Sequence, residues 1–384
     1  MTGVQTCALP IYPGIRSDSD MYTFGFSFHP WKNPKSIADG PSILAYINET
    51  ADTYDLRKNI QFSSKATNAS WSSGANSWTL KVEKTTDGSS RLITCNFLFM
   101  CSGYYNYDHG YLPEFPGFNQ FKGTIVHPQK WDTSLDYAGK EIVIIGSGAT
   151  AVTLLPELAK KAARVTMLQR SPTYVMNLPR EDKLANSLKK ILPAKLAHGA
   201  ARWKNILMSL AFYKACRRWP DKLKAFLKKQ VQKQLGDQYL EQNFDPNYNP
   251  WDQRLCFVPD NDLFRAIKKG NASIVTDGIS TFTETGIALQ SGQHLNADII
   301  VTATGLQLQL FGGMQIFVDG ITAEFKNSHA YKGVMLSGIP NFAIAIGYTN
   351  ASWTLKAELN CRFVTRLLNH MKKHQYKACT PQYD

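Results

Sequence analysis

The order of apolar and polar residues divides the chain into helical and strand-like segments. Apolar residues recur at helical spacing over residues 43–54 and again over residues 353–373. Strand-like runs in the first hundred residues are predicted at 60–62, 77–84 and 91–100. The pair Asp87-Gly88 lies between the last two runs and predicts that a tight turn joins them as a hairpin.

From residue 140 the pattern changes to strand, glycine turn, helix and strand. The first strand, residues 141–145, has an uninterrupted apolar run, and a second such run within residues 297–304 ends before Gly305. Runs of this kind are typical of parallel strands that are buried on both faces. The pattern therefore predicts an α/β fold built around Rossmann-like parallel sheets.

A basic helical region, residues 181–243, lies between these two strands, and Pro193 and Pro220 divide it. Residues 183–234 contain 14 lysines and arginines against one acid, Asp221. The remaining 29 basic and 29 acidic residues cancel, so this region carries the formal charge of +13. Because the charge is local, we expect no nucleic-acid partner.

Two interpretations of the basic region are open. Its leucines, isoleucines and phenylalanines alternate with lysines at roughly helical spacing, which is typical of an amphipathic segment on a membrane surface. The alternative is a helical excursion whose basic face is solvated. The first interpretation predicts a salt-sensitive contact of residues 183–234 with anionic lipid, at the inner face of the membrane.

The seven cysteines are scattered and form no C-x-x-C pair. This spacing argues against a zinc site and against a disulfide framework, and it indicates a reducing compartment, the cytoplasm. No apolar run approaches the roughly 18 residues that a membrane-spanning helix requires.

A glycine motif follows the strand at 141–145 and opens the predicted helix. The motif G-x-G-x-x-A consists of Gly146, Ser147, Gly148, Ala149, Thr150 and Ala151. In this context, the first glycine permits a tight turn and the second lets a pyrophosphate approach the N–H groups of the helix. The small third residue lets helix and strand pack closely. The motif predicts dinucleotide binding, and the alternative is a purely structural glycine turn.

The next strand, residues 165–168, is followed by Gln169 and Arg170. An NAD site would have an acid here to accept a hydrogen bond from the ribose 2′-hydroxyl, whereas an arginine suits a 2′-phosphate. The sequence therefore favours NADP(H) over NAD(H). The alternative is that Arg170 is a solvated charge at a strand end.

A second motif precedes the glycine turn. Its fixed positions are Phe121, Gly123, His127, Trp131 and Asp132. Taken singly, a histidine and a tryptophan at this spacing are more often packing residues than catalysts. The complete string, however, matches the pattern F-x-G-x-x-x-H-x-x-x-W-[PD], so the chain resembles the flavin-dependent Baeyer–Villiger monooxygenases. It is most similar to their ethionamide-activating branch, with which it shares segments such as YPGIRSDSDMYT, WDQRLC and GYTNASWTLKA.

This resemblance implies two Rossmann-like domains, with an NADPH domain inserted in an FAD domain. We expect the FAD domain at residues 12–135 and 298–384, and the NADP domain at 136–297 with the helical excursion 181–243. The implied reaction uses NADPH to reduce the flavin and O₂ to form a C4a-peroxyflavin. That species attacks a ketone and gives an ester or a lactone.

The resemblance also assigns residue roles. It gives Arg254 the task of facing flavin and nicotinamide and stabilising negative charge, and it pairs Asp18 with that arginine and the cofactor. It places His127 and Trp131 in a linker that couples domain rotation to catalysis. The cofactor contacts that it implies are Arg16, Ser17, Asp18, Ala66, residues 146–151, Gln169 and Arg170.

The chain departs from the family pattern at its start. No first-strand G-x-G-x-x-G for FAD precedes residue 140, and residues 1–11 resemble a translated sequencing adapter, the alternative being a genuine short tail. We interpret residues 1–11 as an adapter-derived scar, and expect about fifty further residues before Tyr12 and more after Asp384. On this interpretation the chain is a poorly soluble, inactive fragment without bound FAD.

Three functions stay open. The first is Baeyer–Villiger oxidation of a ketone with FAD, NADPH and O₂. The second is oxygenation of sulfur or nitrogen in a thio-compound or amine by the same cofactors. The third is a non-catalytic NADP-binding fragment, which the retention of flavin would distinguish from the first two.

Overall fold

The computed structural model describes residues 12–253 and 255–383, which divide into two compact units. Among the described residues, the larger unit comprises 12–48 together with His109–Leu306, and the smaller unit comprises Glu49–Asp108 and residues 307–383. The positions 135 and 297 both lie within the larger unit, where strands before and after each of them pair into one sheet.

That sheet is the centre of the larger unit and has five parallel strands in the order β11-β8-β7-β15-β6. Their bounds are β6 Thr124–Val126, β7 Glu141–Ile145, β8 Arg164–Gln169, β11 Ala272–Thr276 and β15 Ile299–Thr302. In this sheet β8 and β11 lie on one side of β7, and β15, which comes later in the chain, lies on its other side. The strand order therefore reverses between β7 and β15.

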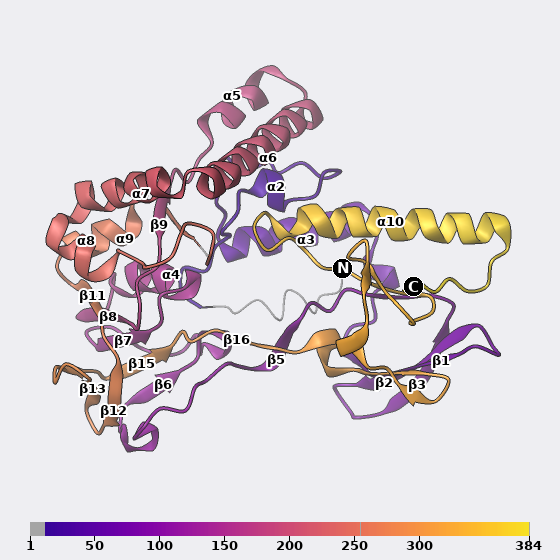
Figure 1. Cartoon of the computed structure of the whole chain (residues 1–384), viewed down its shortest axis with the longest axis horizontal. Helices are drawn as coiled ribbons and strands as arrows, with labels where there is room; N and C mark the ends of the chain where they lie inside the picture. Colours follow the sequence, from indigo (N-terminus) through magenta and orange to yellow (C-terminus); the bar gives the residue numbers. More distant parts are fainter. Residues whose placement is uncertain (1–11, 254, 384) are drawn as a thin grey trace. The chain divides into compact units, whose positions relative to one another are not determined.

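Alternate residues of β7 face two different layers. Ile142 and Ile144 belong to an apolar cluster with the helices α4 (Ala149–Leu158) and α9 (Asp262–Lys268). Val143 and Ile145 pack with the antiparallel strands β12 (Ile279–Thr283), β13 (Gly286–Leu289) and β14 (His294–Asn296). The expected burial of this strand on both faces is thus confirmed, and Figure 1 shows these layers of the larger unit.

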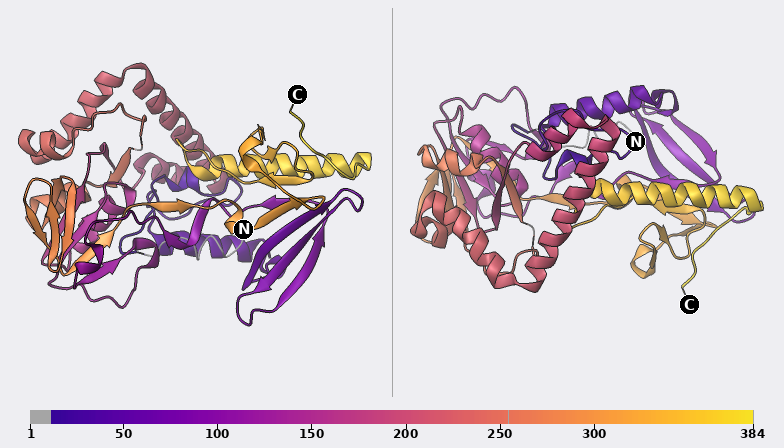
Figure 2. Two further views of the ribbon diagram at one scale, coloured as in Figure 1. Left: turned by 60° about the horizontal axis from the view of Figure 1, so that its bottom comes forward. Right: turned by 90° about the horizontal axis from the view of Figure 1, so that it is seen from above.

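The basic region is helical, as predicted, and its two prolines mark helix starts. Pro193 is the N-cap of α6 and Pro220 is the first residue of α7. The four helices are α5 Lys183–Ile191, α6 Ala194–Arg218, α7 Pro220–Leu235 and α8 Asp237–Asn243. Figure 2 shows the corner at which α6 and α7 meet. At the base of the region, β9 (Val175–Leu178) pairs in parallel with β10 (Cys256–Pro259).

The smaller unit contains a five-stranded sheet in the order β18-β17-β1-β2-β3. Its strands are β1 Ser64–Ser72, β2 Ser77–Lys84, β3 Ser90–Cys95, β17 Gln315–Val318 and β18 Ile321–Thr322. The predicted hairpin at Asp87-Gly88 is confirmed, because β2 pairs antiparallel with β3. The predicted strand at 60–62 is wrong, because the strand begins at Ser64, where a mostly polar run buries Ala69 and Trp71.

The predicted strand at 91–100 is split in two. Its second part, β4 (Leu98–Met100), leaves the hairpin and pairs in parallel with β21 (Phe342–Ile344).

The predicted helices at 43–54 and 353–373 are α3 (Gly40–Thr53) and α10 (Trp353–His374). The remaining short elements are α2 Met21–Phe24, β5 Tyr105–Gly110, β16 Leu306–Leu308, β19 Ala330–Tyr331 and β20 Met335–Leu336. None of the helices in the described ranges is both long and apolar enough to cross a membrane.

Candidate nucleotide-binding site

The carboxyl ends of the parallel strands define one edge of the sheet in the larger unit. Gly146 follows β7, Arg170 follows β8 and Ala303 follows β15. In open α/β sheets, ligands bind outside this edge at the point where the strand order reverses. Here that point lies between β7 and β15, beside Gly146.

The two glycines of the turn have different surroundings. Gly146 has φ +134°, and a Cβ there would overlap the carbonyl oxygen of Ala303. Gly148 has nothing within 4 Å of the position of a Cβ, so the chain leaves open space in front of it. The first glycine is therefore required by the fold, whereas the open space at the second allows another molecule to approach the backbone.

The helix that follows begins without a side-chain cap. Gly148 is the N-cap of α4 and offers no side-chain acceptor to the first N–H groups of the helix. Ala151 is fully buried and lets α4 lie close to the sheet. Uncapped N–H groups beside open space, at the positive end of a ten-residue helix, fit an anionic pyrophosphate.

Gln169, the last residue of β8, and Arg170, which follows it, have different surroundings. Gln169 is buried, and its Nε2 donates to the Asn243 carbonyl and to Thr276 Oγ1, both at 2.8 Å. These bonds tie the end of α8 to β11. Arg170 is exposed, so it is the member of the pair whose guanidinium is accessible to a phosphate.

The segment Arg16-Ser17-Asp18 runs beside α4 and α9. A Cβ at Gly14 would touch Glu157 of α4, which places the start of this segment against that helix. Arg16 forms an ion pair with Asp262 at the start of α9, and both side chains are largely buried.

The three side chains of this segment differ in their burial and hydrogen bonding. Nη2 of Arg16 is buried and has no hydrogen-bond partner among the described residues. Ser17 accepts from the Ala38 N–H through Oγ at 3.1 Å, while Asp18 is exposed and accepts from Ser19. Arg16 thus has an unused buried donor, which a negatively charged group would satisfy.

His127 connects two segments that leave the sheet. Its Nδ1 accepts from the Gln129 N–H at 3.2 Å, so the ring proton is on Nε2, which lies 3.1 Å from the Gly305 carbonyl oxygen. Burial lowers the pKa of His127 below its usual value. A Cβ at Gly110 would overlap the His127 ring. The neutral ring is therefore clamped between residues 110 and 305, close to the points where the chain passes to the smaller unit.

The other residues of the second motif have structural surroundings. Phe121 is buried beside β12, and a Cβ at Gly123 would overlap the Asp298 carbonyl oxygen. Trp131 is half-buried and lies edge-on to Tyr137, while Asp132 accepts from the N–H and hydroxyl of Ser134.

Two predicted residues are not among the described residues of the larger unit. Arg254 is outside the described residues, but the segment before it is anchored to the end of α6. The Trp251 ring packs against Tyr213, and Asp252 forms an ion pair with Arg217. Ala66 belongs to the smaller unit, where it is half-buried in β1 opposite Val82.

Sequence reasoning missed two residues that shape the site. Ala303 closes the glycine turn and Asp262 holds Arg16. No local signal marks either, since each lies more than 150 residues along the chain from its partner.

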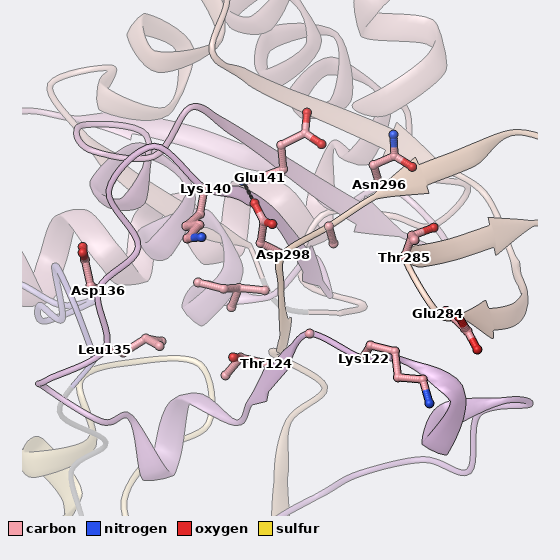
Figure 3. A pocket seen from close by; sticks show the side chains of 13 residues that line it. Lys122, Thr124, Leu135, Asp136, Lys140, Glu141, Glu284, Thr285, Asn296 and Asp298 are labelled. Atoms are coloured by element: carbon pink, nitrogen blue, oxygen red, sulfur yellow. Dashed lines mark hydrogen bonds between the residues drawn. The ribbon is translucent and has the colours of Figure 1, made fainter.

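The larger unit also has a cavity of about 620 Å³ at the opposite edge of the sheet (Figure 3). Its walls include Thr124, Glu141 and Ile299, the first residues of β6, β7 and β15. Asp298 Oδ2 accepts from the Glu141 N–H at 2.8 Å there. The cavity is lined by residues at the starts of the strands, whereas the glycine turn lies at the strand ends, so the two are distinct.

Comparison with known proteins places this geometry in a family. The family described as flavin-binding monooxygenase-like matches residues 11–377. The FAD-containing monooxygenase EthA of Mycobacterium tuberculosis is 54% identical over 362 residues, which cover 94% of this chain and 74% of EthA. The putative FAD-containing monooxygenase MymA of the same organism is 49% identical, covering 97% of this chain and 76% of MymA.

Solved structures share the fold. Cyclohexanone monooxygenase with bound ε-caprolactone has a TM-score of 0.80 at 18% identity, covering 98% of this chain and 82% of that one. The complex of OTEMO with FAD and NADP has a TM-score of 0.77 at 20% identity, covering 98% and 79%. The resemblance to the ethionamide-activating branch and the mixed α/β fold are confirmed, and the chain belongs to the flavin-binding monooxygenase-like family.

Proposed function

We propose that the chain is an FAD- and NADPH-dependent monooxygenase that inserts one atom of O₂ into a ketone. The observation that carries this proposal is the glycine turn at the reversal of strand order, with open space at Gly148 and an uncapped helix behind it. Membership of the flavin-binding monooxygenase-like family supports the reaction class.

NADPH is assigned to the carboxyl edge of the sheet in the larger unit. Residues 146–151 would hold the pyrophosphate, and Arg170 would pair with the 2′-phosphate through its planar guanidinium. The buried, unpartnered Nη2 of Arg16 supplies a further donor for the cofactor. Gln169 would act by fixing the strand end beside Arg170, because its amide nitrogen is already bonded inside the unit.

FAD is assigned to the smaller unit. Its parallel strands β4 and β21 both end at one edge, where Ser102 and Gly103 follow β4. Ser102 Oγ is buried and has no partner within the described residues, and Gly103 turns the chain with φ +72°. A buried hydroxyl without a partner, at the carboxyl ends of parallel strands, fits a polar group of a nucleotide cofactor.

FAD, when bound and reduced by NADPH, supplies the activated oxygen that is transferred to the substrate. The task of this chain is to stabilise negative charge as the oxygen moves. We assign that task to Arg254, because a guanidinium stays protonated and can donate without acting as a base. Asp18 would orient it, as the family resemblance implies.

The loop that carries Arg254 is held by the helical region. The contact of Trp251 with Tyr213 and the ion pair of Asp252 with Arg217 fix the residues immediately before Arg254. A charge stabiliser is effective when it is positioned before the reaction begins, so these contacts serve catalysis by restricting the loop.

His127 is assigned to the coupling of domain motion to catalysis. Its neutral ring bridges the Gln129 N–H and the Gly305 carbonyl, so movement of the segment at Gly305 would be transmitted to the segment that leads to Trp131. This role needs no proton transfer to the substrate.

The test is a product analysis under ¹⁸O₂ with NADPH, using a linear methyl ketone and an aryl methyl sulfide in parallel. We expect one ¹⁸O atom in an ester from the ketone, and loss of ester formation in Arg254→Ala. Labelled sulfoxide without ester would instead establish heteroatom oxygenation. Flavin content of the purified chain is measured alongside, since binding of NADPH without flavin or product would establish a nucleotide-binding fragment.

A further inference from the structure

Helix α6 exposes apolar side chains and buries polar ones. Leu196, Trp203 and Leu207 have 62%, 64% and 58% of their surface exposed. On the opposite face His198 and Arg202 are buried together with Ala197 and Ala201. A helix of a water-soluble domain normally has the reverse arrangement, with its apolar stripe toward the core.

Hydrogen bonds to α2 and its flanking residues explain why polar residues of α6 are buried. Arg202 Nη1 donates to the carbonyls of Tyr22, in α2, and of Gly25, its C-cap, both at 2.8 Å. Asn205 donates to Asp20 at 2.8 Å, the residue that caps the start of α2. These bonds fix the rotation of α6 about its axis, and that rotation determines which residues face outward.

The exposed residues form one continuous stripe. Leu196, Trp203, Leu207 and Leu210 are separated by seven, four and three residues, which is the spacing of one helix face. At 1.5 Å per residue, the stripe is about 21 Å long. In Figure 1, α5 and the start of α6 project above the rest of the larger unit. Helix α5 adds Leu184 and Ile191, both exposed.

Positive charge surrounds this stripe. Besides Arg217, which pairs with Asp252, the exposed cations on the two helices are Lys183, Lys190, Lys195, Lys214 and Arg218. Within the described part of the chain no carboxylate forms an ion pair with these five, and residues 183–234 contain only one acid. The surface formed by α5 and α6 therefore combines an apolar stripe with uncompensated positive charge.

We propose that the α5–α6 surface binds the headgroup region of an anionic phospholipid membrane. Leucine and tryptophan side chains of a helix that lies in the plane of a membrane enter the boundary between headgroups and acyl chains, while lysines contact anionic headgroups. A second copy of the chain fits less well, because pairing two such surfaces would bring two sets of uncompensated lysines together. This surface is separate from the glycine turn and from the reaction proposed above.

The experiment is vesicle flotation with the full chain. One set of vesicles contains phosphatidylcholine only and the other contains added phosphatidylglycerol. We expect binding to the phosphatidylglycerol vesicles at low salt, and weaker binding at high salt because exposed charges are screened. The double variant Trp203→Ser/Leu207→Ser should lower partitioning by about tenfold or more, since two large apolar side chains no longer enter the lipid.

A matched control is Leu92→Ser, which removes a side chain that is 71% exposed on β3 in the other unit. It should bind vesicles like the unchanged chain. Circular dichroism establishes that both variants are folded. Absence of binding to phosphatidylglycerol vesicles, or full binding by the double variant, would overturn the proposal. Sedimentation that shows a dimer broken by the double variant, without lipid binding, would overturn it in favour of a second copy.

Discussion

Helices α4 and α6 lie in the same unit and are built in opposite ways. Helix α4 buries Leu154, Leu155 and Leu158 completely, and its open end meets the glycine turn. Helix α6 buries Arg202 and His198 and exposes Leu196, Trp203 and Leu207. The needs of the core account for every apolar residue of α4, whereas the exposed stripe of α6 contributes nothing to the core. An apolar face that the fold does not require points to a contact outside the chain.

The largest difference in stability is expected between variants of two adjacent residues of α6. We expect Arg202→Leu to lower the free energy of unfolding by about 3 kcal/mol, because the carbonyls of Tyr22 and Gly25 lose their buried donor. Trp203→Ser on the outer face should change it by less than about 0.5 kcal/mol. Urea unfolding of the two variants measures both values, and equal losses would show that α6 does not have its polar face inside.

A matched pair tests the entry to α4. Gly146→Ala should lower the free energy of unfolding by about 2 kcal/mol, because φ is +134° and the added Cβ meets Ala303. Gly148→Ala should cost under about 1 kcal/mol, because it adds a methyl group to open space. Thermal unfolding compares the two. Our assignment of the turn is wrong if Gly148→Ala is the more destabilising change.

The inner face of α6 also predicts a pH dependence. Burial and the nearby Arg202 guanidinium lower the pKa of His198 from 6.5 to about 4. The unfolded chain therefore takes up a proton first as the pH falls, and stability decreases between pH 6.5 and 4 by up to about 3 kcal/mol. His198→Asn should remove this component from a series of urea titrations across that range. An unchanged pH profile in the variant would contradict the assignment.

The smallest expected effect concerns the end of β8. Arg170→Ala should weaken NADPH binding by about tenfold and leave NADH binding unchanged, because the exposed guanidinium contacts only the 2′-phosphate in our assignment. Fluorescence titration with both nucleotides gives this ratio. A parallel loss of affinity for NADPH and NADH would show that Arg170 acts on the strand end and not on the phosphate.

The parts of the fold with strong local signals were predictable. Short stretches of consecutive residues identify the apolar run of β7, the glycines after it and the prolines at the starts of α6 and α7. Strand β1 was missed because its run is mostly polar and only Ala69 and Trp71 are fully buried. A strand with few apolar residues depends on its neighbours, here β2 and β17, for its position.

The site was predictable as a list of residues but not as an arrangement. The glycine motif and Arg170 stand beside their strands in the sequence, so their common edge follows from parallel pairing. The ion pair of Arg16 with Asp262 joins residues 246 apart, and the bonds of Arg202 to the end of α2 join residues up to 180 apart. Because these contacts depend on tertiary packing, the inverted orientation of α6 could not be inferred from its periodicity.

The central claim is that the carboxyl edge of the sheet in the larger unit binds NADPH at the glycine turn. The most direct measurement is an equilibrium titration with NADPH and NADH of the unchanged chain and of Gly148→Asp. Aspartate is a good N-cap, so the variant should fold, but its carboxylate would occupy the pyrophosphate position. We predict saturable binding that favours NADPH and is lost in Gly148→Asp. Equal binding of both nucleotides, unchanged in the variant, would contradict the claim.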